Sequence, residues 1–533
     1  MTELALAWKA LATGWTVPAA FAGVAWGIVG GALPGISPSI AMALLLPFTY
    51  GLDPVTAIVM LASVYVGAEY GGSIPAILIR TPGTNAAAAT VIDGFEMHRR
   101  GRGGEALGIS LVSGLVGGLF GLAVLVAATG PLARFALSFT PPAYFALGVL
   151  GLSVIAGLSG KSLLKGLIAG IIGFMIATIG TDPVSGVARF TFGSPDLLGG
   201  IRPIVVMVGL FAVTELMVQA IEPAWSRVEA GAARLRLPDW RMWRRLFRPQ
   251  AIGAAIGTFE GVTPGAGGTI AAFLSYNEAK RWSKHPEEFG QGSVEGVAAP
   301  ECANNVVTGT ALVPLLGLGI PGSNSAAILL GGFLLHGLAP GPLLFEKSPD
   351  VVYGLYAGLL VANVAMLLLG LVILTPCLWL VNRPKPYLMA FVLALVVSGI
   401  YAMEASFFDV ALVLGAGVLG YGLRWLGVPA LPLVLGVVLG FMVESNYRRA
   451  LVLSGGDHGI FVQDPISLGL LVAAGLNAFI FHRTVGRRKE HWDLSPLTPF
   501  RARLAGALSL GLWATVIVTG RLIAYNWFGA MRP

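Results

Sequence analysis

Long apolar stretches recur along the whole chain, and short polar segments separate them. Most are close to or above the roughly 20 residues that an α-helix needs to cross a bilayer. Strong alternation of apolar and polar residues is absent, so the stretches predict helices rather than the strands of an outer-membrane barrel. The stretches are 105–130, 143–159, 162–181, 203–221, 351–381, 388–403, 408–443, 465–481 and 504–525. The pattern predicts an all-α polytopic membrane protein.

One short polar motif interrupts the apolar pattern twice. Pro82-Gly83-Thr84-Asn85 reappears as Pro321-Gly322-Ser323-Asn324, which Ser325 follows. A Pro-Gly pair breaks a helix, and irregular polar backbone inside a membrane is tolerated only where protein buries it or where it lines a cavity. Two such breaks in corresponding halves point to a transporter's binding site. We therefore expect two re-entrant hairpins with tips at 82–85 and 321–325.

A second pair of breaks lies upstream of these tips. This pair is the segment Gly27-x3-Gly31-x2-Pro34-Gly35 and its match Gly257-x3-Gly261-x2-Pro264-Gly265, at an offset of 230 residues. The two polar motifs are 239 residues apart. The later copy therefore has nine extra residues between its breaks, and the charged stretch Asn277–Gln291 is where we place them. The pattern predicts two repeats, inverted relative to each other, with broken helices and about 12 transmembrane or hairpin helices in all.

A polar, arginine-rich segment divides the two halves. The predicted units are a first half at 15–223, a basic cytoplasmic connector at 224–250, a second half at 251–482, and a basic loop with an extra C-terminal transmembrane helix at 483–533. The interleaved Trp225, Trp240 and Trp243 suit an amphipathic helix on the inner membrane surface. A solvated connector between two halves is the alternative.

Composition agrees with a membrane protein and explains the basic charge. The chain is 56% hydrophobic and only 11% charged, against about 25% charged residues in soluble domains. The net charge of +7 comes with basic loops at 97–102, 161–165 and 227–248. An even number of predicted helices separates these loops, so all three lie on one side, and Lys and Arg mark the cytoplasmic side. We expect lipid rather than nucleic acid as the partner of this charge.

The free ends of broken helices can bind ions. Half-helix N-termini suit a carboxylate, and half-helix C-termini with unwound carbonyls suit Na⁺. The candidate substrate-binding residues are Thr84, Asn85, Ser323, Asn324, Ser325 and Arg80. Helix capping and interhelical hydrogen bonds are the alternative for the polar residues. Arg80 suits either bidentate contact with a substrate carboxylate or an ion pair with Glu69.

Ionisable and amide side chains within apolar segments are candidates for ion coupling. The candidates for ion binding or a proton relay are Gly35, Ser37, Gly265, Gly267, Glu69, Glu301, Asn304 and Asn305. An interhelical hydrogen-bond cluster is the alternative around Glu301. No nucleophile–base pair or metal-ligand spacing is legible, so the sequence predicts no enzyme activity, no catalytic residue and no resident cofactor or metal beyond Na⁺ as a coupling ion.

Several longer motifs carry a family resemblance. They include Gly31-Ala-Leu-Pro-Gly35, Tyr65-Val-Gly-Ala-Glu-Tyr-Gly-Gly-Ser73, Ile92-Asp-Gly-Phe95, Glu295-Gly-Val-Ala-Ala-Pro-Glu-Cys-Ala-Asn-Asn305 and Leu318-Gly-Ile-Pro-Gly-Ser323. In combination they closely resemble the large permease subunit of tripartite tricarboxylate transporters, the TctA family, over roughly 15–485. The resemblance implies a multi-pass secondary transporter of the bacterial inner membrane. It also implies a small four-helix membrane subunit and a periplasmic substrate-binding protein as partners.

The function predicted from these features is import of an organic di- or tricarboxylate by symport with Na⁺ or H⁺. The periplasmic binding protein would deliver the carboxylate to the permease. A passive anion channel is the first alternative, although no ring of charge or repeated carbonyl-filter motif supports it. The second alternative is an intramembrane enzyme that modifies a lipid, and the scattered Glu69, Glu260 and Glu301 form no convincing catalytic pair for it.

Overall fold

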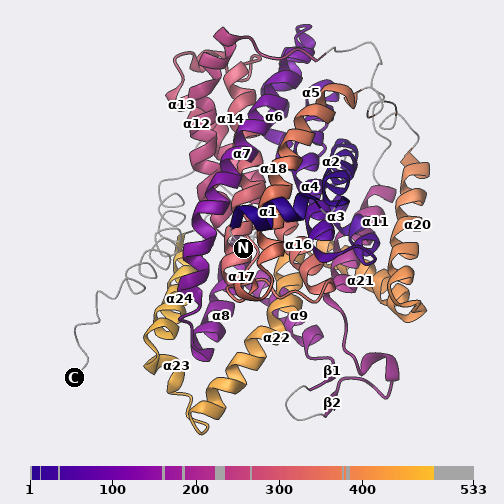
Figure 1. The fold of residues 1–533 in the computed structure, drawn as a ribbon, viewed down its shortest axis with the longest axis vertical. Helices are drawn as coiled ribbons and strands as arrows, with labels where there is room; N and C mark the ends of the chain where they lie inside the picture. The colour runs from indigo at the N-terminus through magenta and orange to yellow at the C-terminus, as the bar shows by residue number, and fades with distance from the viewer. Residues whose placement is uncertain are drawn as a thin grey trace, which may run out of the picture.

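The computed structural model describes residues 3–12, 14–33, 36–158, 163–182, 187–221, 235–263, 267–374, 377, 379 and 385–484. Helices dominate this part of the chain (Figure 1). They are α1 (Glu3–Ala12), α2 (Thr16–Ala32), α3 (Pro38–Leu45), α4 (Pro54–Gly71), α5 (Ser73–Ile79), α6 (Ala87–Arg99), α7 (Gly103–Ala136), α8 (Pro141–Leu158), α9 (Leu163–Ala177), α10 (Pro203–Val208), α11 (Thr214–Ile221), α12 (Trp240–Val262), α13 (Gly267–Trp282), α14 (Val294–Thr310), α15 (Leu312–Leu318), α16 (Asn324–Leu335), α17 (Leu344–Lys347), α18 (Pro349–Val372), α20 (Lys385–Glu404), α21 (Phe407–Trp425), α22 (Ala430–Leu453), α23 (Ile460–Gln463) and α24 (Pro465–Thr484).

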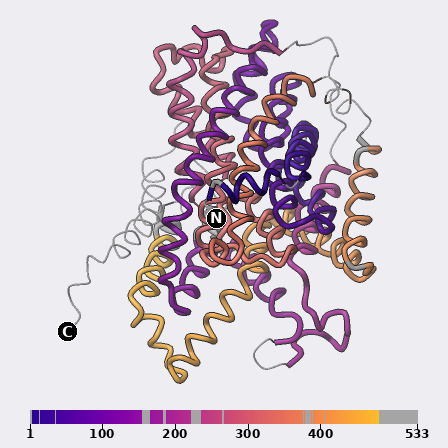
Figure 2. Tube along the Cα trace, viewed as in Figure 1, coloured from indigo at the N-terminus to yellow at the C-terminus, as the bar shows by residue number. Residues whose placement is uncertain are grey.

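Short 3₁₀ and π turns and one β-ribbon complete the described chain. The 3₁₀ turns are η1 (Leu46–Thr49), η2 (Pro195–Leu197) and η4 (Pro286–Glu288), and the π turn η3 (Gly209–Val213) joins α10 to α11. Strands β1 (Gly180–Thr181) and β2 (Ala188–Arg189) pair antiparallel. The sequence pattern did not predict this ribbon, because two-residue strands are too short to show an alternation. In Figure 2 it lies at the same end of the molecule as the turn between α22 and α23.

Six helical segments of the described chain are long and apolar enough to cross a bilayer. They are Pro54–Ile79, Gly103–Ala136, Pro203–Ile221, Pro349–Val372, Phe407–Trp425 and Ala430–Leu453. Six shorter apolar helices accompany them: Pro38–Thr49, Pro141–Ser153, Lys165–Ala177, Asn324–Leu335, Met389–Met403 and Pro465–Asn477. The prediction of a helical membrane protein is confirmed at this level.

The outer surface of α18 has the composition of a lipid-facing helix. Leu360, Val364, Leu368 and Val372 are all at least 44% exposed and recur at four-residue spacing. Residues four apart lie on one face of a helix, so these side chains form an apolar stripe. A stripe of this kind is stable in contact with lipid tails. On a protein in water, a contiguous apolar patch of this kind would mark an interaction site.

The apolar run predicted at 408–443 proves to be two helices. It divides between α21 and α22, where Gly427 adopts a left-handed φ of 67° and Pro429 precedes the first residue of α22. A glycine takes this conformation without steric cost, and a proline cannot continue the preceding helix. The hydropathy of the run hid the turn because its flanking residues are apolar.

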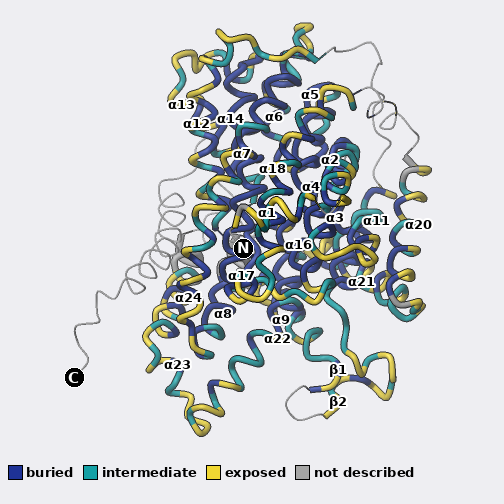
Figure 3. Tube along the Cα trace, viewed as in Figure 1, coloured by how far each residue is buried: buried dark blue, intermediate teal, exposed yellow. Residues whose placement is uncertain are grey.

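The buried core joins segments from both halves of the sequence. Helix α2 packs along α4, α12 packs along α14, and α14 also packs along α7. Buried residues run through these central helices, whereas the peripheral α20 and α23 carry many exposed ones (Figure 3). Of the predicted connector, the structure describes the part from residue 235 onward. Helix α12 begins there at Trp240, and the side chain of its N-cap residue Asp239 accepts a hydrogen bond from the Met242 amide.

A buried carboxylate holds the loop between α13 and α14. Asp93, on α6, is fully buried, and its Oδ1 accepts hydrogen bonds of 2.8 Å from the backbone amides of Gly290, Gly292 and Ser293. Its Oδ2 accepts a hydrogen bond of 2.9 Å from the Tyr276 hydroxyl. This loop belongs to the stretch in which the sequence places its nine extra residues, so Asp93 ties that stretch to the first hairpin.

We expect Asp93→Ala to lower the stability of the folded protein by more than about 3 kcal/mol. It leaves three amides without an acceptor, and each buried unsatisfied group costs about 1–3 kcal/mol. Asp93→Asn should cost less, because its amide oxygen still accepts. Thermal unfolding of the detergent-solubilised protein measures both effects. The exposed Asp196→Ala is the control, and an equal effect of that variant would contradict the assignment.

Candidate functional site

Both hairpins turn at a residue with left-handed backbone. Helix α5 ends at Arg80, with φ 58°, and α15 ends at Gly319, with φ 77°. These residues are 239 positions apart, which is the offset between the two polar motifs. The glycine adopts this conformation freely, whereas an arginine incurs a steric cost of about 1–2 kcal/mol in the left-handed region. The turn itself is therefore part of each hairpin, whatever residue occupies it.

The two tips also fold back in the same way. The Gly83 amide donates a hydrogen bond of 3.0 Å to the Gly72 carbonyl, and the Gly322 amide donates one of 3.2 Å to the Ala311 carbonyl. A Cβ at position 83 would lie 1.9 Å from the carbonyl oxygen of Gly31. Each tip is thus pinned at its glycine, and the first packs directly on the backbone of α2.

Each tip continues into a helix through a hydroxyl residue. Thr84 Oγ1 accepts a hydrogen bond of 3.3 Å from the Ala87 amide, and Ser323 Oγ accepts one of 3.1 Å from the Ala326 amide. Ser323 is therefore the N-cap of α16. Thr84 lies two residues before Ala86, the N-cap residue of α6, so its bond belongs to the turn that leads into that helix. Both hydroxyl residues nevertheless face a common space.

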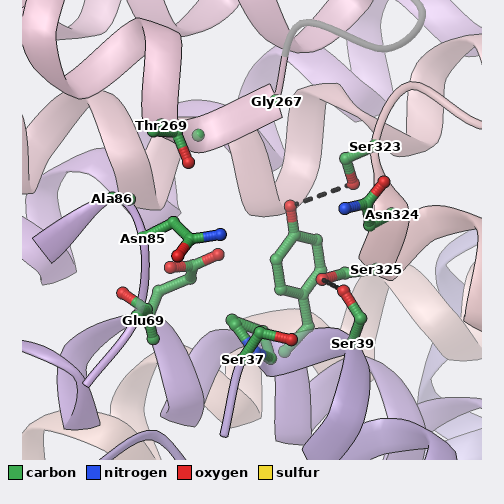
Figure 4. Close-up of a pocket in the computed structure, with 14 residues that line it drawn as sticks. Ser37, Ser39, Glu69, Asn85, Ala86, Gly267, Thr269, Ser323, Asn324 and Ser325 are labelled. Atoms are coloured by element: carbon green, nitrogen blue, oxygen red, sulfur yellow. Dashed lines mark hydrogen bonds between the residues drawn. The ribbon is translucent and has the colours of Figure 1, made fainter. Parts of the chain in front are cut away.

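That space is a small polar cavity of about 110 Å³ between the two tips (Figure 4). It is lined by Ser37, Pro38, Ser39, Tyr65, Glu69, Thr84, Asn85, Ala86, Gly267, Gly268, Thr269, Ser323, Asn324 and Ser325. All five polar tip residues predicted from the sequence are among them. The tertiary structure thus brings together residues that lie up to 288 positions apart, from Ser37 to Ser325.

Four helices begin at this cavity. Ser37 caps α3 by accepting a hydrogen bond from the Ile40 amide, and Gly267 is the first residue of α13. Helix α6 begins at Ala87, just after the first tip, and α16 begins at Asn324, within the second tip. A helix N-terminus carries unpaired N–H groups and the positive end of the helix dipole, both of which favour an anion. Four such ends at one cavity favour a ligand with more than one negative group.

The side chains at the cavity differ in their freedom to bind a ligand. Tyr65 Oη and Ser323 Oγ are 3.2 Å apart, and Ser39 Oγ and Ser325 Oγ are 3.4 Å apart, so these hydroxyls already have partners. Within the described chain, the side-chain amides of Asn85 and Asn324 form no hydrogen bond, and both residues are exposed. An amide offers donors and an acceptor, so these two are the best placed to bind a ligand directly.

The predicted ion-binding residues fall into three groups. Ser37, Gly267 and Glu69 line the cavity, and Asn304 Nδ2 donates a hydrogen bond of 2.8 Å to Glu69 Oε2. Pro34-Gly35 and Pro264-Gly265, where the sequence predicts broken helices, lie outside the described residues. Glu301 and Asn305 are buried away from the cavity lining.

Glu301 is surrounded by hydroxyl groups. Its Oε1 accepts hydrogen bonds from Ser73, at 2.5 Å, and from Thr90, and its Oε2 accepts one of 2.9 Å from Ser110. Asn305 Nδ2 donates to the backbone carbonyl of Glu301 at 2.9 Å. The three hydroxyls come from α5, α6 and α7, so this cluster joins the first hairpin to α14. The described residues around it match the hydrogen-bond cluster that was the alternative for Glu301.

Arg80 lies away from the cavity. It is exposed, its guanidinium carbon is 5.9 Å from the centre of the Phe95 ring, and no ion pair joins it to Glu69 within the described chain. It is also absent from the cavity lining. In this structure Arg80 therefore acts as the left-handed end of α5.

We expect Arg80→Gly to leave stability unchanged within about 1 kcal/mol and to leave ligand affinity unchanged. Relief of the left-handed cost of about 1–2 kcal/mol is offset by greater freedom of the unfolded chain and by loss of the cation–π contact, about 0.5–1 kcal/mol. Thermal unfolding and the concentration dependence of transport measure these quantities. A loss of affinity of about tenfold or more, or roughly 1.4 kcal/mol, would place the guanidinium at the ligand instead.

Sequence reasoning missed three polar residues of the cavity. Tyr65 stands in a motif that carries the family resemblance, but its own role was not recognised. Ser39 and Thr269 are 230 positions apart, the offset of the upstream breaks. Comparing polar as well as identical residues between the two copies would have found this pair. Histidine, cysteine, aspartate and glutamate side chains form no group of three or more in the described part of the chain that suits a metal ion.

Comparison with known proteins identifies the family of this chain. The profile of the tripartite tricarboxylate transporter TctA family matches residues 17–435. The chain is 39% identical over 484 residues to an Agrobacterium vitis protein named "Uncharacterized 52.8 kDa protein in TAR-I ttuC' 3'region", covering 89% of this chain and 95% of that protein. It is 40% identical over 217 residues to the A. vitis "Uncharacterized protein in TAR-II ttuC' 3'region", covering 40% of this chain and 89% of that protein. No solved structure matches. The chain therefore belongs to the tripartite tricarboxylate transporter TctA family.

Proposed function

We propose that this chain is the large permease subunit of a tripartite system that imports an organic di- or tricarboxylate. The observation that carries the proposal is the convergence of four helix N-termini on one polar cavity with two free amides. Helix N-termini favour anions, and a substrate with several carboxylates can meet more than one of them. Family membership supports the same substrate class.

In this proposal the two hairpins are the gates of a secondary transporter. Asn85 and Asn324 contact the substrate, together with Ser325, while Thr84 and Ser323 hold the tips in place. The chain is a multi-pass protein of the bacterial inner membrane, with about 12 spanning or hairpin helices in two inverted repeats. Its basic loops at 97–102, 161–165 and 227–248 face the cytoplasm, in accordance with the bias of Lys and Arg to that side.

The proposed partners are a small four-helix membrane subunit and a periplasmic substrate-binding protein. An ion gradient drives uptake, and Na⁺ or H⁺ moves with the carboxylate. No catalytic step is assigned to the chain, since the lining offers hydroxyls, amides and one carboxylate but no nucleophile with an adjacent base among the described residues.

Uptake into vesicles that contain all three components tests the proposal. A Na⁺ gradient and a pH gradient are imposed separately across a panel of dicarboxylates and tricarboxylates. Saturable uptake that requires the binding protein and one of the gradients is the expected result. Flux that persists without the binding protein and does not saturate would identify a channel and overturn the proposal.

A further inference from the structure

The cavity contains a single carboxylate at a place otherwise suited to an anion. Glu69 is 5% exposed and lines the cavity with hydroxyls and amides. No arginine or lysine of the described chain lines it, and the titratable groups that interact electrostatically with Glu69 are Tyr65 on its own helix and Glu301 on α14. An ionised Glu69 would therefore repel a carboxylate substrate across a short distance. The negative charge of Glu69 must therefore be neutralised when a carboxylate binds.

Asn304 supplies the second observation. Its side chain is 2% exposed, and its Nδ2 is already used by Glu69. Its Oδ1 is buried and has no hydrogen-bond partner within the described residues. Buried polar atoms of this kind are rare and call for an explanation such as a bound ion or water. A cation that both side chains contact would pair with this oxygen and balance the charge of Glu69.

Gly268 lets the backbone of α13 approach this unpaired oxygen. A Cβ at this position would lie 2.2 Å from Asn304 Oδ1. Gly268 and Thr269 both line the cavity. In Figure 4, Glu69, Asn85 and Thr269 are on one side of the cavity, whereas Ser323, Asn324 and Ser325 are on the other. Glu69, the only carboxylate among the described residues that line the cavity, thus lies opposite the tip of the second hairpin.

We propose that Glu69, Asn304 and the Thr269 hydroxyl bind a monovalent cation of the size of Na⁺ at the Gly268 side of the cavity. Carboxylate, amide carbonyl and hydroxyl oxygens are the ligands that hard cations prefer. One carboxylate contributes one negative charge, which a single monovalent charge balances. Asn85, and Ser325 and Asn324 on the opposite side, are left for the substrate.

This arrangement couples the two ligands through charge. With the cation bound, Glu69 no longer repels a carboxylate, so each ligand strengthens the binding of the other by the same factor. Only this coupling step rests on the proposed function. Binding of the cation alone depends on the geometry around Glu69, Asn304 and Gly268, and can be measured without any carboxylate.

Thermal unfolding of the purified full chain in detergent tests cation binding. Sodium chloride is compared with potassium chloride and choline chloride at equal ionic strength and fixed pH, without carboxylate. We expect Na⁺ to raise the unfolding midpoint in a concentration-dependent way. Glu69→Gln and Gly268→Ala should each abolish this shift, the first by removing the charge and the second by displacing the Asn304 oxygen, which lies 2.2 Å from the added Cβ.

Matched variants separate a lost ion from a damaged protein. Glu260→Gln replaces a buried glutamate that does not line the cavity, and Gly415→Ala adds a methyl group where no atom lies within 4 Å, so both should retain the full Na⁺ shift. An equal shift with choline, an unchanged shift in Glu69→Gln, or stabilisation by lowered pH in place of Na⁺ would each overturn the proposal.

Carboxylate binding distinguishes this inference from the proposed function. We expect saturating Na⁺ to tighten carboxylate binding about 5- to 150-fold, the usual range of such coupling, and Glu69→Gln to remove the dependence. Carboxylate binding without any Na⁺ effect would refute the cation site and leave the proposed function intact. A Na⁺ shift without binding of any carboxylate in the panel would refute the proposed function and retain the cation site.

Discussion

Replacing Asn324 with alanine is expected to weaken carboxylate binding by about tenfold to a hundredfold, with the protein still folded. The Asn324 amide lies at the tip of the second hairpin, faces the cavity and forms no hydrogen bond with the described chain. Its loss therefore removes no hydrogen bond from this part of the fold. A hydrogen bond to a charged group contributes about 1.5–3 kcal/mol, and each 1.4 kcal/mol is about a factor of ten in affinity.

The corresponding Asn85→Ala should have an effect of similar size, because Asn85 occupies the same place on the first hairpin. Binding of radiolabelled carboxylates to the purified protein, and uptake into vesicles, measure both variants. Asn277→Ala is the matched control, since Asn277 is exposed on α13 and does not line the cavity. Wild-type affinity and uptake in both hairpin variants, inserted normally, would show that the cavity is not the substrate site.

The second large effect is expected at the glycines of the two tips. Gly83→Ala places a Cβ 1.9 Å from the Gly31 carbonyl oxygen, and Gly322→Ala places one 2.5 Å from the Gly261 carbonyl oxygen. Real Cβ atoms do not approach backbone so closely, so each tip must move away from the helix on which it packs. Forced displacement of packed backbone typically costs about 1–3 kcal/mol and sometimes more. We expect a loss of more than about 3 kcal/mol for Gly83→Ala and a smaller loss for Gly322→Ala.

Thermal unfolding and the yield of membrane-inserted protein measure these losses. Gly422→Ala is the control, because an added methyl group in α21 meets no atom within 4 Å and alanine favours the helix by up to about 1 kcal/mol. Both tips should also lose substrate binding, since Thr84 and Ser323 follow the displaced glycines directly. A stable Gly83→Ala protein with normal transport would mean that the tip does not pack on α2 in the working protein.

Much of the fold and of the site follows from local sequence. Apolar runs are a direct record of burial in lipid, and a Pro-Gly pair inside such a run excludes a continuous helix. For this reason the sequence alone was enough to select Thr84, Asn85, Ser323, Asn324 and Ser325, and all five line the cavity. The repeat offset of 239 also anticipates the shared turn, at which Arg80 and Gly319 both adopt left-handed backbone.

Other features depend on contacts that no local pattern encodes. Arg80 and Glu69 are only eleven positions apart, yet Arg80 lies against Phe95 and Glu69 pairs with Asn304, 235 residues away. Asp93 has the pattern of an ordinary helix residue until the loop at 290–293 folds over it. Their partners come from other helices and loops, so their roles appear only when the helices pack.

The sequence by itself therefore determined that this is a helical membrane protein of the TctA family with two matched polar breaks. These properties follow from hydropathy and from the backbone limits of proline and glycine, which act over a few residues. Only the tertiary structure decided that four helix N-termini meet at one cavity, and that Glu69 and Asn304 pair beside it. Those facts depend on the packing of α3, α4, α6, α13, α14 and α16, which lie far apart along the chain.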